Sequence, residues 1–290
     1  MELTHTATRS GRLSSFLREE MAMSAGLMNR LKWQDRIFVN QIPRHTDFTV
    51  SIGDVISVLL EEPAPNYPAE DGPLSILYED DHILAVDKPA GMLIHPSRSR
   101  LTGTLANRVL FYYRKTNQSS VFHPVTRLDR DTFGVVLLAK NAHVHTLLAD
   151  SDLQKTYHAL VYGSPREEAG RIDAPIARKP LPSLLREIHP EGKPSVTEYR
   201  VLARLEGIAK LALQPITGRT HQLRLHCAHM GWPILGDPQY CTPESRHFSD
   251  GLGLESQLLC ARELAFTHPV TGESLRICSE MDAALPVRNL

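Results

Sequence analysis

The segment from residue 123 to 140, HPVTRLDRDTFGVVLLAK, constrains the fold more than any other part of this 290-residue chain. A charged stretch leads directly into the apolar run Val135–Ala139, which predicts a buried strand. Asp129 lies ahead of this strand, at a bend between Arg127 and Arg130. Because nearby positive charge favours the ionised form of a carboxyl group, this pattern predicts a carboxylate placed at a bend to meet a ligand.

An isolated Arg-Leu-Asp tripeptide is most often a surface ion pair that contributes little. In this chain the tripeptide belongs to a longer pattern, close to RLD-x-x-TSG followed by hydrophobic residues and Ala-Lys. The matching residues are Arg127, Leu128, Asp129, Thr132, Gly134, Ala139 and Lys140. In this pattern the chain resembles the RluA-type RNA pseudouridine synthases. Phe133 departs from it, because the family usually has Ser at that position.

Three further stretches resemble the same family and follow one another in the family's order. They are KTYHALVYG from residue 155, PITGRTHQLRLHCAHMGWPILGDPQY from residue 215, and LLCARELAFTHPVTGE from residue 258. A single motif of this kind is weak evidence, whereas four in register are strong evidence. The sequence is therefore identified as a member of this family over residues 74–280.

The resemblance implies an α+β fold, with a large mixed, mostly antiparallel central sheet flanked by helices and loops. Apolar alternation and turn residues predict strands at residues 76–78, 82–87, 92–94, 135–139, 157–162, 196–205, 208–215, 234 and 275–278. Helices are predicted at residues 104–113, 141–149 and 218–230, the first beginning at a threonine cap.

Residues 11–62 are predicted to form a small N-terminal α/β module. Apolar residues recur at helical spacing from Leu13 to Met21, Ser24 is a candidate helix cap, and short strands follow with a turn at Asn40–Gln41. The pattern resembles the small RNA-binding module named after ribosomal protein S-four, although Gln41 replaces the usual turn glycine. The alternative is an ordinary helix–hairpin subdomain. Residues 63–73, rich in proline and acidic side chains, predict an extended linker, and residues 74–290 the catalytic domain.

Composition constrains the partners and the compartment. With 32 Lys and Arg against 33 Asp and Glu, the chain lacks an overall basic charge, so RNA binding requires cations clustered on one face. The four cysteines show no CxxC spacing, which argues against a disulfide framework or a zinc ribbon. Neither a signal peptide nor a membrane span is recognisable. We expect a cytoplasmic protein, by default a monomer, without membrane contacts.

Pseudouridine formation breaks the C1′–N1 bond of uridine and joins C1′ to C5, which requires no external co-substrate. The resemblance assigns the catalytic role to Asp129, with Tyr157 stacking on the detached uracil and Arg219 pairing with the Asp129 carboxylate. From the sequence, attack of Asp129 on C1′ and assistance of proton loss at C2′ both remain open. The expected cofactor is none, and no metal is expected, because His221, His226 and His229 are spread around a helix axis.

Contacts with RNA are assigned to three other cations. The family resemblance implies that Arg127 fills the space left by a flipped-out uridine, and Lys155 and Arg224 are candidate phosphate contacts. The substrate is predicted to be ribosomal or transfer RNA. Two alternatives remain: a non-catalytic RNA-binding protein that retains the synthase scaffold, suggested by Phe133, and a nucleoside hydrolase, which usually requires two carboxylates.

Overall fold

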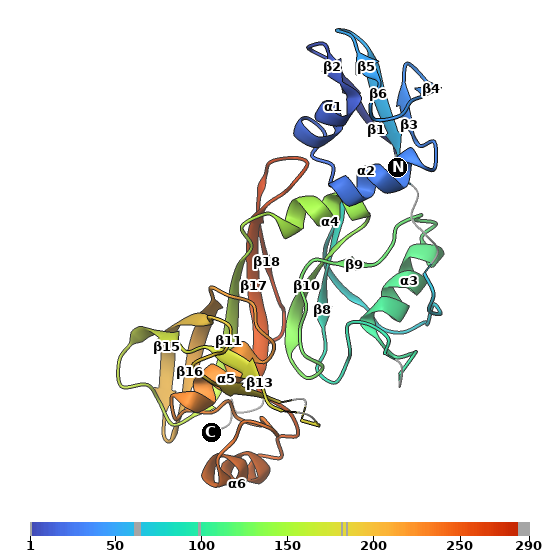
Figure 1. Cartoon of the computed structure of the whole chain (residues 1–290). Coiled ribbons are helices and arrows are strands. Elements are labelled where there is room, and N and C mark those ends of the chain that lie inside the picture. The colour runs from blue at the N-terminus through green and yellow to red at the C-terminus, as the bar shows by residue number, and fades with distance from the viewer. Residues whose placement is uncertain (1, 61–64, 98–99, 181, 184, 284–290) are drawn as a thin grey trace.

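The computed structural model describes residues 2–60, 65–97, 100–180, 182–183 and 185–283 (Figure 1). Within these residues the chain forms a small N-terminal module and a larger body built on a ten-stranded sheet. Residues 61–62 of the predicted module and residues 63–64 of the predicted linker lie outside the described residues. So do positions 98–99, 181, 184 and 284–290 of the predicted catalytic domain.

The N-terminal module combines two helices with two small sheets. The helices are α1 (Leu13–Glu19) and α2 (Ala25–Lys32), and the strands are β1 (Glu2–Thr6), β2 (Gly11–Arg12), β3 (Ile37–Val39), β4 (Ile42–Pro43), β5 (Thr49–Val50) and β6 (Val55–Leu59). One sheet has the order β1-β6-β3-β4, and β2 pairs with β5. The Ser24 hydroxyl accepts a hydrogen bond from the Leu27 amide, as predicted for a helix cap.

A separate hydrophobic core stabilises this module. Every buried member of that core lies between Ala7 and Leu60. The module begins earlier than residue 11, because β1 pairs along its whole length with β6. The stretch Glu2–Thr6, ELTHT, has a single apolar residue and therefore lacks the apolar alternation by which strands are recognised in a sequence. At the predicted turn, Asn40 and Gln41 both have positive φ, of 49° and 67°.

The described part of the predicted linker packs against the catalytic body. Tyr67 contacts the core that contains α3 (Leu105–Lys115). The Glu70 amide donates to the Asn107 carbonyl at 3.1 Å, and the Asn107 side chain donates to the Pro68 carbonyl at 2.7 Å. Residues 67–73 therefore form neither helix nor strand, and they lie against α3 instead of spanning open solvent.

The central sheet is mixed and almost wholly antiparallel, as the resemblance implied. Its order is β12 (Ala169–Asp173), β15 (Val196–Leu205), β16 (Ile208–Pro215), β11 (Gln154–Tyr162), β17 (Leu259–Thr267), β10 (Phe133–Ala139), β8 (Ile83–Lys88) and β7 (Ser75–Glu79). In addition, β9 (His123–Pro124) pairs with β10, and β18 (Ser274–Cys278) pairs with β17. A separate hairpin contains β13 (Ile176–Arg178) and β14 (Arg186–Ile188).

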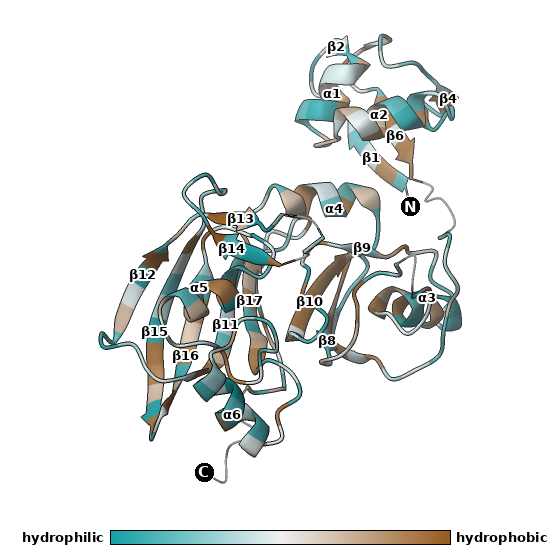
Figure 2. Cartoon of the chain, turned by 60° about the horizontal axis from the view of Figure 1, so that its bottom comes forward, coloured by the Kyte–Doolittle hydropathy of each residue, from teal (hydrophilic) through white to brown (hydrophobic). Residues whose placement is uncertain are grey.

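The parallel pair β10–β17 joins the two halves of this sheet. Strand β10 is apolar along most of its length and buried after Phe133 (Figure 2). It meets β17 only at Phe133 opposite Cys260 and Gly134 opposite Ala261. Gly134 has φ +112°, and a Cβ built there would lie 2.3 Å from the Ala261 carbonyl oxygen. Only glycine permits this close approach of the two backbones.

Three differences from the predicted elements concern the surroundings of the sheet. Residues 92–94 do not form a strand; the carbonyls of Leu93 and Ile94 instead accept hydrogen bonds from the start of α3. The predicted helix 218–230 is shorter, because α5 (Gln222–His229) starts after a left-handed residue. Helix α6 (Pro243–Gly251) and the hairpin strands β13 and β14 were not predicted, and neither were the sheet strands β12 and β17. Helix α4 (Ala142–Ala149) agrees with prediction.

Candidate active site

A cavity of about 740 Å³ lies at the junction of the turn before β10, strand β11 and the connection from β16 to α5. This volume falls in the usual range for a small-ligand site. Its lining includes all six residues that the sequence singled out: Arg127, Asp129, Lys155, Tyr157, Arg219 and Arg224. Phe133, at the position where the family usually has Ser, is not among the residues that line the cavity.

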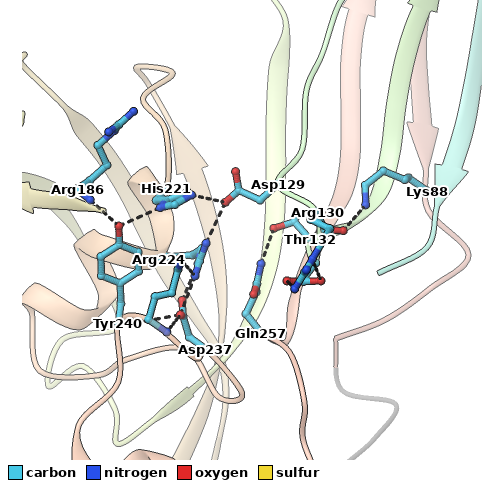
Figure 3. Close-up of polar contacts among 12 residues, drawn as sticks. Lys88, Asp129, Arg130, Thr132, Arg186, His221, Arg224, Asp237, Tyr240 and Gln257 are labelled. Carbon is cyan, nitrogen blue, oxygen red and sulfur yellow. Dashed lines mark hydrogen bonds and ion pairs between the residues drawn. The ribbon is translucent and has the colours of Figure 1, made fainter. Parts of the chain in front are cut away.

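Asp129 lies on a turn that is held from both sides. The Thr132 amide donates to the Asp129 carbonyl at 3.2 Å and closes the turn. On one side the buried Lys88 ammonium donates to the Arg130 carbonyl at 2.9 Å, and on the other side Gln257 donates to the Thr132 hydroxyl (Figure 3). These tertiary contacts fix the position of the carboxylate in the cavity wall.

The groups that approach the Asp129 carboxylate are not its neighbours in sequence. Arg130 forms a two-pronged ion pair with Asp131, with both distances at 2.9 Å, so it does not neutralise Asp129 as predicted. The Asp129 Oδ2 atom instead lies 3.4 Å from Arg224 Nη1 and 3.9 Å from His221 Nε2 (Figure 3). Among the described residues no hydrogen bond or ion pair reaches Oδ1, so this oxygen is available to a ligand.

Arg224 is buried and carries the main ion pair of the site. Its Nε and Nη2 atoms donate to the two carboxylate oxygens of Asp237 at 2.6 and 2.8 Å, and Nη2 also donates to Gln239. Burial opposes the charge, but the hydrogen bonds and the charge of Asp237 raise the pKa of Arg224 above its usual value. Arg224 therefore acts as a fixed positive charge behind Asp129. Four of its five N–H groups have protein partners, which favours this structural role over the predicted phosphate contact.

Arg219 does not pair with Asp129. Its side chain is exposed, and its Nε donates to the Pro194 carbonyl at 3.3 Å. The reason lies in the backbone, since Arg219 precedes α5, whereas Arg224 lies within the helix on the face turned toward Asp129. Arg224 rather than Arg219 therefore pairs with Asp129, and Arg219 is exposed at the cavity edge.

Tyr157 lies on β11 beside a bulge that follows Thr156. A bulge redirects the side chains next to it, and here the half-buried Tyr157 lines the cavity. Burial, together with the negative charge of Asp129, raises the pKa of the Tyr157 phenol. The phenol therefore keeps its proton and can donate a hydrogen bond to a ligand.

The rim of the cavity carries further cations. Arg127 is exposed, and Lys155 is half-buried, with burial lowering its pKa. A second groove of about 380 Å³ shares the segment Gly218–Thr220 with the cavity and is lined by Arg178, Arg186 and Lys193. Cations therefore line both the cavity and the adjoining groove, although the chain as a whole is nearly neutral.

Sequence reasoning missed three residues of the site: Lys88, His221 and Tyr240. Lys88 is buried, donates to the carbonyls of Pro89, Met92 and Arg130, and has its pKa lowered by burial to about 8. Lys88 ends the buried strand β8. A buried ammonium group needs hydrogen-bond partners, so a lysine at the end of an apolar run was the available signal in the sequence. Tyr240 and His221 hydrogen-bond to each other at 2.9 Å, a contact between distant segments that no local pattern encodes.

The described residues contain no group of three side chains arranged to bind a metal ion. His226 is buried and hydrogen-bonds to the Thr197 hydroxyl and the Ala174 carbonyl. In the same described part of the chain, no helix has both the length and the apolar character needed to cross a membrane.

Comparison with known proteins agrees with this geometry. Residues 82–229 match the family described as RNA pseudouridylate synthase. An uncharacterized RNA pseudouridine synthase of Bacillus subtilis, YjbO, is 34% identical over 235 residues, which cover 79% of this chain and 81% of the relative. Ribosomal large subunit pseudouridine synthase D of Xanthomonas campestris is 39% identical over 234 residues, covering 76% and 70%.

A solved structure supports the same assignment. The structure titled human RNA pseudouridylate synthase domain containing 1 superimposes with a TM-score of 0.60 at 27% sequence identity, covering 76% of this chain and 87% of that chain. The chain therefore belongs to the RluA-type RNA pseudouridine synthases, and it is an isomerase that converts uridine in RNA to pseudouridine.

Proposed function

We propose that Asp129 is the catalytic residue and that it acts on a uridine flipped out of the RNA into the 740 Å³ cavity. The observation that carries this proposal is the asymmetry of the Asp129 carboxylate. Arg224 and His221 both approach Oδ2, whereas Oδ1 has no partner among the described residues. A carboxylate held by one oxygen presents the other to the ribose, where it attacks C1′ or assists at C2′.

Other groups of the cavity have complementary roles in this proposal. Tyr157 stacks on the detached uracil and takes part in proton transfer at C5, which its protonated phenol allows. Arg127, exposed at the rim, occupies the gap in the RNA stack and offsets part of the few kcal/mol that unstacking costs. Lys155 binds a backbone phosphate beside the flipped nucleotide.

For the substrate we propose ribosomal RNA of the large subunit. Relatives from Xanthomonas campestris and Haemophilus influenzae, at 39% and 36% identity, are named ribosomal large subunit pseudouridine synthase D. The N-terminal module, with its own core, is proposed as an additional RNA-binding unit. On it Trp33 is 77% exposed, with the Lys32 ammonium 5.2 Å from its ring, a combination suited to stacking on an unpaired base.

The test is conversion of uridine in ribosomal RNA by Asp129→Asn and Asp129→Ala, followed as tritium release from C5-labelled RNA. Both variants are expected to bind the RNA as the wild type does and to release no tritium. Asp250→Asn, at an exposed position on α6, is the matched control and is expected to turn over normally. Normal turnover by Asp129→Ala would refute the catalytic assignment, and free uracil among the products would indicate a hydrolase.

A further inference from the structure

The ring of His221 lies between the phenol of Tyr240 and the carboxylate of Asp129 (Figure 3). Its Nδ1 atom is 2.9 Å from the Tyr240 oxygen, and its Nε2 atom is 3.9 Å from Asp129 Oδ2. The distance between Nδ1 and the Tyr240 oxygen is that of a hydrogen bond. The distance between Nε2 and Asp129 is longer than a hydrogen bond, as distances between catalytic groups often are before substrate binds.

The hydrogen bonds of Tyr240 favour one of the two neutral forms of the His221 ring. The backbone amide of Arg186, in β14, donates to the Tyr240 oxygen at 2.9 Å. The phenol proton is then free to be donated to His221 Nδ1. An imidazole nitrogen that accepts a hydrogen bond has no proton of its own, so the neutral ring carries its proton on Nε2. In this form the Nε2–H group faces Asp129.

The backbone around His221 is held firmly in place. His221 itself adopts a left-handed conformation, with φ 59°, which is uncommon for residues other than glycine. The next residue, Gln222, is buried; its side-chain oxygen accepts from the Arg219 amide and the Thr217 hydroxyl. Its amide nitrogen donates to the Val196 carbonyl at 2.9 Å. A strained conformation that surrounding contacts enforce is typical of functional sites.

We propose that His221 is a positioning residue: its neutral ring, with the proton fixed on Nε2 by Tyr240, holds Oδ2 of Asp129 and leaves Oδ1 directed at the ribose. This inference rests on the catalytic role proposed for Asp129. It assigns to the hairpin strand β14 and to the loop carrying Tyr240 a function in aligning the carboxylate.

The electrostatic surroundings of His221 are consistent with a neutral ring. The charged groups that influence it are Asp129, Asp237, Arg224 and Arg186. Burial lowers the pKa of His221 and outweighs the opposing effect of the Asp129 carboxylate. The donor Tyr240 is also buried, and burial raises its pKa, so the phenol retains the proton that it donates.

The tautomer can be measured without any assay of activity. In ¹⁵N-labelled wild-type protein, two-bond correlations of the imidazole nitrogens are expected to show His221 neutral with the proton on Nε2. The signals are assigned by their loss in His221→Gln. In Tyr240→Phe the donor to Nδ1 is lost, and a mixture of both tautomers is expected. A proton on Nδ1 in the wild type, or an unchanged tautomer in Tyr240→Phe, overturns the proposal.

Turnover supplies the second arm of the test. Single-turnover rates at saturating RNA are expected to fall about two- to tenfold in His221→Leu, as for loss of one hydrogen bond, with unchanged RNA affinity. His221→Gln is expected to recover most of the rate, because its amide can donate to Asp129 and accept from Tyr240. Leucine and glutamine are both unbranched at the β-carbon, so the backbone strain at this left-handed position is the same in the two variants and does not affect their comparison. His229→Leu, exposed at the end of α5, is the matched control.

These outcomes separate the two proposals. A wild-type rate in His221→Leu, or equal losses in His221→Leu and His221→Gln, refutes the positioning role even if Asp129→Asn is inactive. Normal turnover by Asp129→Asn refutes the catalytic assignment, and the nitrogen signals then still report whether Tyr240 sets the tautomer.

Discussion

Replacing Asp237 by alanine is expected to destabilise the protein more than any other single charge deletion near the site. The Asp237 side chain is fully buried and accepts four hydrogen bonds. Two come from Arg224, at 2.6 and 2.8 Å, and two from the amides of Gln239 and Tyr240, at 2.9 and 3.1 Å. Alanine would leave the guanidinium of Arg224 buried without its principal counter-charge, since Asp129 is 3.4 Å away and partly exposed.

The expected magnitude follows from the burial of both partners. Deleting one member of a buried ion pair costs about 3–5 kcal/mol, a large share of the roughly 5–15 kcal/mol by which a domain is stable. For a catalytic body of this size each kcal/mol lowers the melting temperature by about 2–4 °C, so a decrease of about 6–20 °C is expected. Asp237→Asn preserves the shape and one acceptor oxygen and should fall between the wild type and Asp237→Ala.

The assay is thermal and urea unfolding of the full chain, followed by circular dichroism. The matched control is Asp173→Ala. The Asp173 side chain is 63% exposed, and its ion pair with Arg171 is long, at 3.9 Å, so this pair should contribute less than about 1 kcal/mol. If Asp237→Ala melted together with this control, the reasoning that Arg224 depends on Asp237 for its burial would be wrong.

Three further predictions concern the backbone, the pH dependence and the RNA contacts. Gly134→Ala should lower the free energy of unfolding by about 3 kcal/mol, because the new Cβ meets the backbone of β17. Gly207 also has a positive φ but has open space around it, so Gly207→Ala should cost only about 1 kcal/mol. Urea unfolding measures both changes. Burial lowers the pKa of His226 in the folded protein. As the pH falls, the unfolded chain binds a proton at this residue before the folded protein does. The free energy of unfolding should therefore fall below about pH 6.5, by at most about 1.4 kcal/mol per pH unit for this residue. Denaturant midpoints on either side of that pH would measure the change. Lys193→Ala and Arg219→Ala should each weaken RNA binding at every RNA sequence. Each should also reduce the slope of log affinity against log salt concentration by about one unit, as measured by titration at several salt concentrations. An unchanged slope would exclude the 380 Å³ groove as a phosphate site.

Local signals in the sequence were sufficient for most of the elements that frame the site. The apolar run after Asp129 became the buried strand β10. Thr104 caps α3 in a reciprocal pair with Asn107, and Ser24 caps α2, because capping depends only on residues within one turn. Helix α6 was missed because its nine residues, PESRHFSDG, are mostly polar and bury only Ser245 and Ser249.

Three family motifs in the sequence were enough to select six residues that line one cavity: Arg127, Asp129, Lys155, Tyr157, Arg219 and Arg224. Their contacts with one another, and the presence of Lys88, His221 and Tyr240 beside them, follow from the folded chain. Asp129 and Arg224 are 95 positions apart. Their pairing depends on the residue at which α5 begins and on the left-handed backbone at His221, which turns Arg224 inward and leaves Arg219 in solvent. Charge pairing in a folded chain is decided by distance and burial, and neither can be read from adjacency in sequence.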